Sequence, residues 1–346
     1  MKLKVLFLIT LFLFSLMTEL SAKKVERKNR LENQSLTLNE PIDLHVTDEI
    51  DPLRKSKVNL VSEDAWLFFD NLIPSEVIRK YSQAIQINGK PFISGTRGNA
   101  RIAIYKQGAV IIPHTNEYKP LETFPEQGFN GISNTYLTHT YYTNKPSEEI
   151  PKALSSALKH DNIIHSFKLK RGYMATFATE PDGLGYSRIF IADTADINIS
   201  EMPIELDGRI SYIRVFPWQW PSKKGWSGGR GHIVESNGWN RQTNEIALTQ
   251  STWFYSWGIS DPLCVDAEFV PMKWGYGGHF DEINARREVT HLLGYNEQNR
   301  PDQSNMSVEQ AIEEWPRLMK SGLRLGSPSV SDNSRLESWL YKFIDE

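Results

Sequence analysis

Between about residue 62 and residue 216, short apolar and β-branched runs alternate with turn dipeptides. Residues 100–105 and 109–112 are two such runs, and the Gln107-Gly108 turn between them predicts a hairpin. Further strand-like runs are found at 163–169, 173–178, 186–192 and 210–216. One helix is expected at 148–159, because its apolar residues fall on one face. The pattern as a whole is typical of an antiparallel β-sandwich or barrel.

From about Lys223 the apolar pattern changes, and short strand-like runs alternate with helical stretches. The expected strands are 252–257, 269–274, 291–295 and 323–328, and the expected helices are 307–321 and 336–343. Ser307 and Gln310 have the spacing of a capping box at the start of the first of these helices. Such alternation predicts a parallel sheet, which a TIM-type (β/α) barrel can close. A complete barrel takes about 250 residues, so we expect a barrel of about five strands that is incomplete at the C-terminus.

The first residues have the pattern of a secretory signal peptide. Lys2 and Lys4 precede an apolar run over 5–17, and Leu20-Ser21-Ala22 supplies small residues where cleavage is expected. The rival interpretation is an uncleaved membrane anchor, but the run is shorter than the roughly 20 residues that a spanning helix needs. We therefore expect a secreted or periplasmic protein with no stable membrane insertion after cleavage.

The sequence therefore predicts a multi-domain chain, with an all-β N-terminal sandwich followed by an α/β barrel. The expected divisions are a signal peptide at 1–22, a polar linker or arm at 23–58, a β-sandwich accessory domain at 59–217 and a partial (β/α) barrel at 218–346.

Composition excludes several classes of function. The 346 residues include 39 Lys and Arg against 42 Asp and Glu, and a balanced charge argues against a nucleic-acid partner. Cys264 is the only cysteine, which excludes an internal disulfide framework and a multi-cysteine metal site. His279 and His291 lack the spacing of metal ligands. We accordingly expect no cofactor and no metal.

Several motifs follow one another in the C-terminal third. They are Phe269-Val-Pro-Met-Lys-Trp-Gly275, His291-Leu-Leu-Gly-Tyr-Asn-Glu-Gln-Asn299, Asp302-Gln-Ser-Asn-Met306, Trp315-Pro316, Gly322-Leu-Arg-Leu-Gly-Ser-Pro328, Trp339-Leu340 and Phe343. Together they resemble the catalytic core of glycoside hydrolase family 128. The resemblance implies endo-acting, retaining hydrolysis of β-1,3-glucan, and hence a polysaccharide substrate. It also places Asn296-Glu297 at the end of the fourth barrel strand, where Glu297 is the general acid/base.

Further roles are expected for residues around Glu297. Asn296 is expected to donate to the sugar 2-hydroxyl, and Trp257 and Trp274 at strand ends are expected to pack on sugar rings. Tyr295 is included among the substrate-binding residues. The chain departs from the family in having Gln298 where a proline is usual, and in offering no residue for the nucleophile, which the family carries on strand seven. The alternative interpretation is a secreted carbohydrate-binding protein without catalysis.

In the β-rich region, the segments 166–177, 185–190 and 210–215 form a second pattern. It resembles, more weakly, a βγ-crystallin-type Greek key. That fold often binds calcium through a short polar segment, to which Asp161-Asn-Ile-Ile-His-Ser166 is close. His165 replaces the Ser or Thr that supplies a ligand oxygen, so we expect a plain surface turn there.

Overall fold

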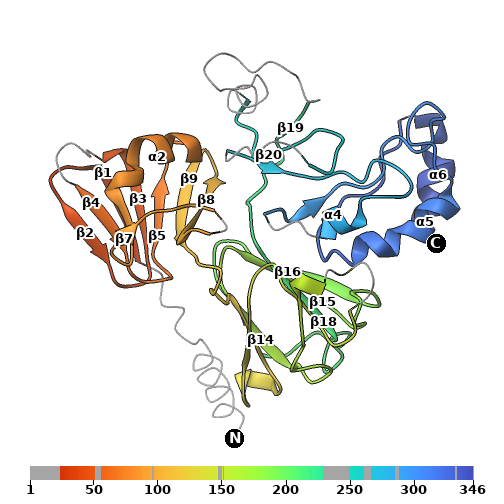
Figure 1. Cartoon of the computed structure of the whole chain (residues 1–346), viewed down its shortest axis with the longest axis horizontal. Helices are drawn as coiled ribbons and strands as arrows, with labels where there is room; N and C mark the ends of the chain where they lie inside the picture. Colours follow the sequence, from red (N-terminus) through yellow and green to blue (C-terminus); the bar gives the residue numbers. More distant parts are fainter. Residues whose placement is uncertain are drawn as a thin grey trace, which may run out of the picture.

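The computed structural model describes residues 24–50, 56–95, 97–146, 150, 152–228, 249–260, 266–284, 288–331 and 333–345. The expected signal peptide at 1–22 and Cys264 lie outside these residues. Three structured regions follow one another along the chain: a two-sheet β-coil, a β-sandwich and an α/β unit (Figure 1).

The β-coil is the region from residue 24 to residue 113, in which the chain passes back and forth between two sheets. One sheet has the order β1-β3-β5-β9-β8, with β1, β3 and β5 parallel, and the other has the order β2-β4-β6-β7, with β2, β4 and β6 parallel. The elements are β1 (Lys24–Leu31), β2 (Ser35–Leu38), β3 (Ile42–Ile50), β4 (Lys57–Leu60), β5 (Trp66–Phe69), α2 (Pro74–Tyr81), η2 (Ser82–Ala84), β6 (Ile85–Ile87), β7 (Lys90–Pro91), β8 (Ala100–Tyr105) and β9 (Gly108–Pro113). The predicted hairpin is confirmed, since Tyr105 pairs with Gly108 across the turn from β8 to β9.

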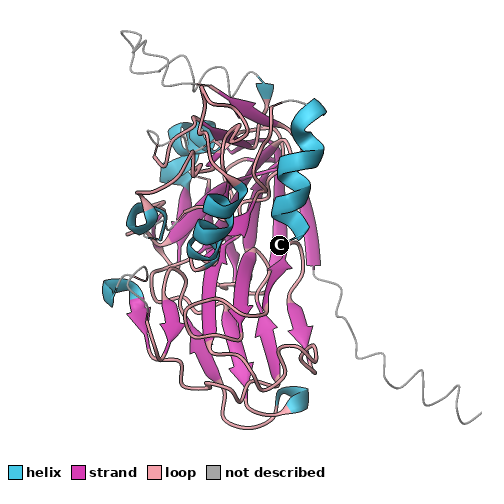
Figure 2. Cartoon of the chain, turned by 90° about the vertical axis from the view of Figure 1, so that its right-hand side faces the viewer, coloured by secondary structure: helices cyan, strands magenta, loops and turns pink. Residues whose placement is uncertain are grey.

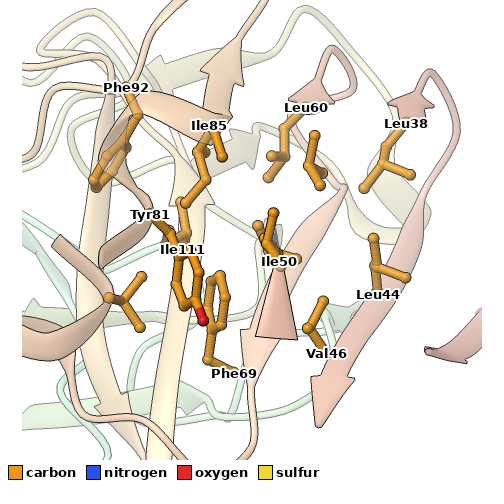
Figure 3. Packing of buried hydrophobic residues seen from close by; sticks show 14 of the residues in the cluster. Leu38, Leu44, Val46, Ile50, Leu60, Phe69, Tyr81, Ile85, Phe92 and Ile111 are labelled. Carbon is orange, nitrogen blue, oxygen red and sulfur yellow. The ribbon is translucent and has the colours of Figure 1, made fainter. Parts of the chain in front are cut away.

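The polar linker expected at 23–58 contains strands instead. Leu44, Val46 and Ile50 are buried in one core between the two sheets, together with Leu38 and Leu60 (Figure 3). In β3 these apolar residues alternate with polar ones, so that only one face of the strand enters the core. A charged composition therefore concealed a strand pattern of period two.

The β-sandwich has a separate core, so the β-rich region expected as one domain contains two. Its first sheet has the order β11-β10-β14-β17 and its second the order β13-β12-β18-β15-β16. The strands are β10 (Leu121–Phe124), β11 (Asn134–Tyr136), β12 (Tyr141–Thr143), β13 (Ser155–Ser156), β14 (Ser166–Leu169), β15 (Tyr173–Ala178), β16 (Ser187–Ala192), β17 (Ile197–Ile199) and β18 (Tyr212–Pro217), with a 3₁₀ turn, η3 (Gln127–Phe129), after β10. All pairings are antiparallel except that of β12 with β13.

The helix expected at 148–159 is not formed by the described part of that segment. The chain makes a 3₁₀ turn, η4 (Lys152–Leu154), and then enters strand β13. The Asn144 side chain both donates to the Leu158 carbonyl and accepts from the Leu158 amide, each at 3.0 Å. This contact with a distant side chain competes with helical hydrogen bonds.

The α/β unit has parallel strands in chain order, as predicted. They are β19 (Gly225–Ser227), β20 (Trp253–Tyr255), β21 (Glu268–Phe269), β22 (His291–Leu292) and β23 (Arg324–Leu325). A parallel bridge between Met272 and Leu293 joins the β19-β20-β21 ribbon to the β22-β23 pair. Among the described strands β19 and β23 pair on one side only, so this sheet is open rather than closed into a barrel.

Helices α4 (Phe280–Asn284), α5 (Val308–Met319) and α6 (Asn333–Asp345) belong to the α/β unit. Figure 2 shows the longer helices in the upper part of the molecule and mostly strands and loops below. The capping box predicted for α5 is confirmed, because Ser307 Oγ accepts from the Gln310 amide and Gln310 Oε1 accepts from the Ser307 amide. Pro316 lies inside the helix, which ends before Gly322.

Side chains of the β-sandwich bind the backbone carbonyls that follow α5. Tyr212 donates to the Lys320 carbonyl at 3.0 Å, Arg214 donates to Ser321, and Thr176 Oγ1 donates to Gly322 at 2.6 Å. Lys320 is the C-cap of α5, so the Tyr212 contact satisfies one of the carbonyls that have no partner within the helix. The contacts of Arg214 and Thr176 bind the turn that joins α5 to β23. Strands β15 and β18 therefore hold the end of α5 and the turn after it.

The β-coil is joined to the other two units by similar contacts. Asp266, just before β21, accepts from the Ser75 amide at the N-terminus of α2 at 2.8 Å. Arg171 of the sandwich makes a two-point ion pair with Asp43 of β3 at 2.7 and 3.0 Å and lies 3.5 Å from the Trp66 ring centroid. One apolar cluster also contains residues of all three units, among them Trp66, Phe216 and Leu292.

The hydrogen bond from Thr176 to the turn after α5 gives a testable expectation for stability. Thr176→Val removes the hydroxyl donor and leaves the buried Gly322 carbonyl without it, so we expect the free energy of unfolding to fall by about 1–3 kcal/mol. Urea denaturation measures the change. The same substitution at the exposed Thr135 of β11 is the control and is expected to change stability by less than about 0.5 kcal/mol. Equal stability of the two variants would show that the hydrogen bond from Thr176 to Gly322 contributes nothing.

Candidate active site

The C-terminal ends of the parallel strands lie side by side and are tied by backbone hydrogen bonds. The Met272 amide donates to the Gly258 carbonyl at 3.0 Å, and the Asn296 amide donates to the Trp274 carbonyl at 3.0 Å. The Glu297 amide donates to the Ser329 carbonyl at 2.7 Å, and Asn296 forms a parallel bridge with Ser329. The segments that follow β20, β21, β22 and β23 therefore share one edge, where a parallel α/β fold presents functional groups.

Glu297 lies on this edge with its carboxyl group open to solvent. Its side chain is 33% exposed, and its backbone has a left-handed φ of 44°. A non-glycine residue in this region pays a strain cost, and such residues cluster at functional sites. The Arg300 amide donates to the Glu297 carbonyl at 2.9 Å, which closes a turn immediately after the carboxyl group.

Arg300 is a cation close to the Glu297 carboxylate, with its Nη1 3.9 Å from Glu297 Oε2. Its guanidinium is also bound by Asp302, which accepts from Nε at 2.9 Å and from Nη2 at 2.6 Å. The hydrogen bond from Arg300 lowers the pKa of Asp302, so this carboxylate stays charged. Asp302 therefore offsets much of the positive charge beside Glu297.

Asn296 is held for directional hydrogen bonding, whereas Tyr295 is not available to a ligand. The Asn296 side chain is largely buried and donates from Nδ2 to Gln303 Oε1 at 3.1 Å. Tyr295 is fully buried, and its hydroxyl donates to the Ala311 carbonyl of α5 at 3.4 Å. Burial raises the pKa of Tyr295, as expected for a phenol packed under a helix. The expectation that Tyr295 contacts substrate is therefore corrected: it anchors the strand to the helix layer.

Gln298, which stands where the family has a proline, is buried and joins two strand ends. We assign the orientation of its amide from its neighbours: with the nitrogen facing the Tyr295 and Ser329 carbonyls, it donates to them at 3.3 and 3.0 Å. Its own carbonyl accepts from the Met306 amide at 3.0 Å. The substitution thus replaces a rigid ring with a side chain that bridges the segments after β22 and β23.

Exposed aromatic residues lie along the same edge. Trp257 and Trp274 are each 40% exposed, which is high for tryptophan, and both follow parallel strands. Trp257 packs edge-on against Tyr255 with ring centroids 5.2 Å apart, and Tyr255 in turn stacks with Trp253. Both candidates from the sequence therefore lie where a ligand above the strand ends can reach them.

Several residues of this edge were not found by sequence reasoning. They are Gln303, which orients Asn296, and the buried pair formed by Lys273 and Glu314, whose charged atoms are 3.5 Å apart. Lys273 donates to the carbonyls of Gly275 and Gly277 in the loop after Trp274. The sequence feature that could have revealed Lys273 is its position between Met272 and Trp274, where a charged residue interrupts an apolar run.

The polar segment at 161–166 forms the plain turn that the sequence predicts. Asp161 accepts from Ser211 at 2.5 Å and from Asn144 at 3.0 Å, while His165 pairs with Asp207 at 2.7 Å. These oxygens are engaged within the protein. Within the described ranges no three His, Cys, Asp or Glu side chains gather as metal ligands would. The helices in those ranges are all too short or too polar to cross a bilayer.

Residues 232–346 match the glycosyl hydrolase catalytic core family. This match confirms the resemblance predicted from the motifs of the C-terminal third. No curated protein matches the chain.

Solved structures similar to the chain include two of a family 128 (subgroup I) endo-β-1,3-glucanase from Amycolatopsis mediterranei. A variant of that enzyme bound to laminaritriose and laminaribiose is 30% identical over 36% of this chain and 50% of its own, with a TM-score of 0.30. A second variant, with laminarihexaose, is 31% identical over 35% and 49%, with a TM-score of 0.28. The chain thus spans about half the length of this glucanase. A βγ-crystallin domain from Flavobacterium johnsoniae is 18% identical over 28% of this chain and 94% of its own, with a TM-score of 0.22.

The Gln298 bridge gives a second testable expectation. Gln298→Met keeps the length of the side chain but removes both hydrogen bonds, while the two carbonyls retain their backbone partners. We expect the free energy of unfolding to fall by about 1–2 kcal/mol, the usual net value of one or two hydrogen bonds. Urea denaturation measures it, with the exposed Gln127→Met as the matched control. A loss no larger than that of the control would contradict the bridging role.

Proposed function

We propose that this protein is an exported glycoside hydrolase that cleaves a β-glucan of the β-1,3-linked type internally. The observation that carries the proposal is the placement of Glu297. Its side chain is partly open to solvent, and its backbone amide donates to the Ser329 carbonyl at the end of the neighbouring strand, inside the region that matches the glycosyl hydrolase family. The similar glucanase from Amycolatopsis is described with bound laminari-oligosaccharides, and we extend that substrate class to this chain.

In the proposed reaction Glu297 acts as the general acid/base of a retaining mechanism. Its carboxyl proton passes to the glycosidic oxygen as the bond from that oxygen to the anomeric carbon breaks. Asn296, oriented by Gln303, donates to the sugar 2-hydroxyl, a contact that strengthens in the transition state. Trp257 and Trp274 pack against the C–H faces of sugar rings and hold the polymer across the strand ends.

The mechanism also needs a nucleophilic carboxylate about 5–5.5 Å from the acid/base. We assign this role to no residue of 1–346, because the family carries its nucleophile on a later strand than those described here. The role of Glu297 is testable by itself, because a small external anion can replace a missing nucleophile.

The experiment measures cleavage of laminarin by residues 23–346 with and without sodium azide. Azide attacks the anomeric carbon, a C–N bond forms as the C–O bond breaks, and Glu297 supplies the proton to the departing oxygen. We expect azide to accelerate the shortening of the polymer, followed by size-exclusion chromatography. Glu297→Gln should reduce the azide-dependent rate by about 10²–10⁴-fold, the usual contribution of a general acid.

The control is Glu288→Gln, which removes an exposed carboxylate from the segment just before β22 and is expected to leave the rate unchanged. An unchanged rate for Glu297→Gln would remove Glu297 from the mechanism. Retention in laminarin-containing gels with no cleavage under either condition would instead indicate a carbohydrate-binding protein.

A further inference from the structure

The loop after Trp274 carries a second exposed aromatic residue that the proposed site does not yet include. Tyr276 is 51% exposed and lies between Gly275 and Gly277. Gly277 and Gly278 have φ values of 74° and 67°, which are left-handed conformations that glycine adopts at little cost. A segment this rich in glycine loses much chain entropy when it is ordered, so its conformation needs specific contacts.

Those contacts come from two charged residues beneath the loop. Lys273 donates to the carbonyls of Gly275 and Gly277, and the Gly277 amide donates to Glu314 Oε1 of α5 at 2.6 Å. The side chains of Lys273 and Glu314 are 2% and 4% exposed, with 3.5 Å between Lys273 Nζ and Glu314 Oε2. The backbone on both sides of Tyr276 is therefore bound by buried groups.

A buried ion pair is a poor way to gain stability alone. Removing two charges from water costs as much as their attraction returns, and apolar pairs of similar volume are often equally stable. Here the two charged groups also form hydrogen bonds with the backbone of one exposed loop. Their arrangement is explained if the position of that loop matters.

The loop begins beside the proposed acid/base. The Trp274 carbonyl accepts from the amide of Asn296, the residue before Glu297, at 3.0 Å. The Tyr276 hydroxyl is 3.5 Å from Glu313 Oε2, and the negative charge of Glu313 raises the pKa of the phenol, so the ring stays neutral. A neutral aromatic ring two residues from Trp274 offers a further face for a sugar ring.

We propose that Tyr276 is a further sugar-binding residue of this site and that Lys273 and Glu314 are the positioning residues that hold it there. The inference rests on the proposed function, since it assigns the ring to the same β-glucan. The ligand face is an aromatic platform that takes the next sugar unit along the polymer from Trp274.

The test measures the dissociation constant for laminarin by affinity electrophoresis. Tyr276→Ala is expected to weaken binding about tenfold, and Tyr276→Phe to retain it, because the ring face and not the hydroxyl makes the contact. Tyr341→Ala removes an equally exposed tyrosine from α6 and is expected to bind as the parent protein does.

The positioning role is tested with the double variant Lys273→Met/Glu314→Gln. It removes both buried charges together and leaves an amide oxygen to accept from Gly277, so the fold is retained. We expect faster chymotrypsin cleavage after Tyr276 and weaker binding of laminarin. Because the pair acts through Tyr276, adding Tyr276→Ala to the double variant should weaken binding no further.

Each outcome has a distinct meaning. Parent-like binding by Tyr276→Ala overturns the assignment of Tyr276 while leaving the proposed function intact. Additive losses, or an unchanged rate of chymotrypsin cleavage, overturn the positioning role. A parent protein that does not bind laminarin overturns both this inference and the proposed substrate.

Discussion

Side chains of the β-sandwich bind the C-cap carbonyl of helix α5 and the two carbonyls after it, and the arrangement of the molecule depends on this contact. The carbonyls of Lys320, Ser321 and Gly322 immediately precede β23, so the donors from the sandwich act at the N-terminal end of a parallel strand. Arg214 makes this contact from a fully buried position, over the rings of Tyr141 and Phe216. Burying a guanidinium is costly unless it is hydrogen-bonded, and the Ser321 carbonyl accepts one of its hydrogen bonds.

This contact lies at the N-terminal ends of the parallel strands, where the β-sandwich packs. The C-terminal ends of the same strands are left open to a ligand. At the N-terminal end, His291 starts β22 with its ring 5.4 Å from that of Trp218, and its ring nitrogen lies 3.2 Å from the buried Glu268 carboxylate. At the C-terminal end, Glu297 and Trp274 remain partly exposed. In α/β barrels, residues at the N-terminal ends of the strands usually serve stability and those at the C-terminal ends serve catalysis. Here the β-sandwich packs against the N-terminal ends.

The sequence predicted those features that depend on local signals. Helix α5 was found because Ser307 and Gln310 are hydrogen-bonded within a few residues, and the edge bearing Glu297 was found because its motif is contiguous. The strand β3 was missed because its partners are 18 or more residues away and its outward residues are charged. The expected helix near Leu158 failed for a similar reason, since Asn144 engages its backbone from another part of the chain.

Tyr295 and Glu297 show why the sequence predicted one residue of the site correctly and another wrongly. A sequence motif places them together, but the backbone directs the tyrosine toward α5, where Ala311 accepts its hydroxyl, and leaves the glutamate open to solvent. Gln298 then fixes the turn by donating to the Tyr295 and Ser329 carbonyls on two neighbouring strand ends. A left-handed backbone at Glu297 is strained and persists only where the neighbouring residues are fixed. The buried phenol of Tyr295 and the bridging amide of Gln298 fix those neighbours, and the Glu297 side chain therefore keeps one position.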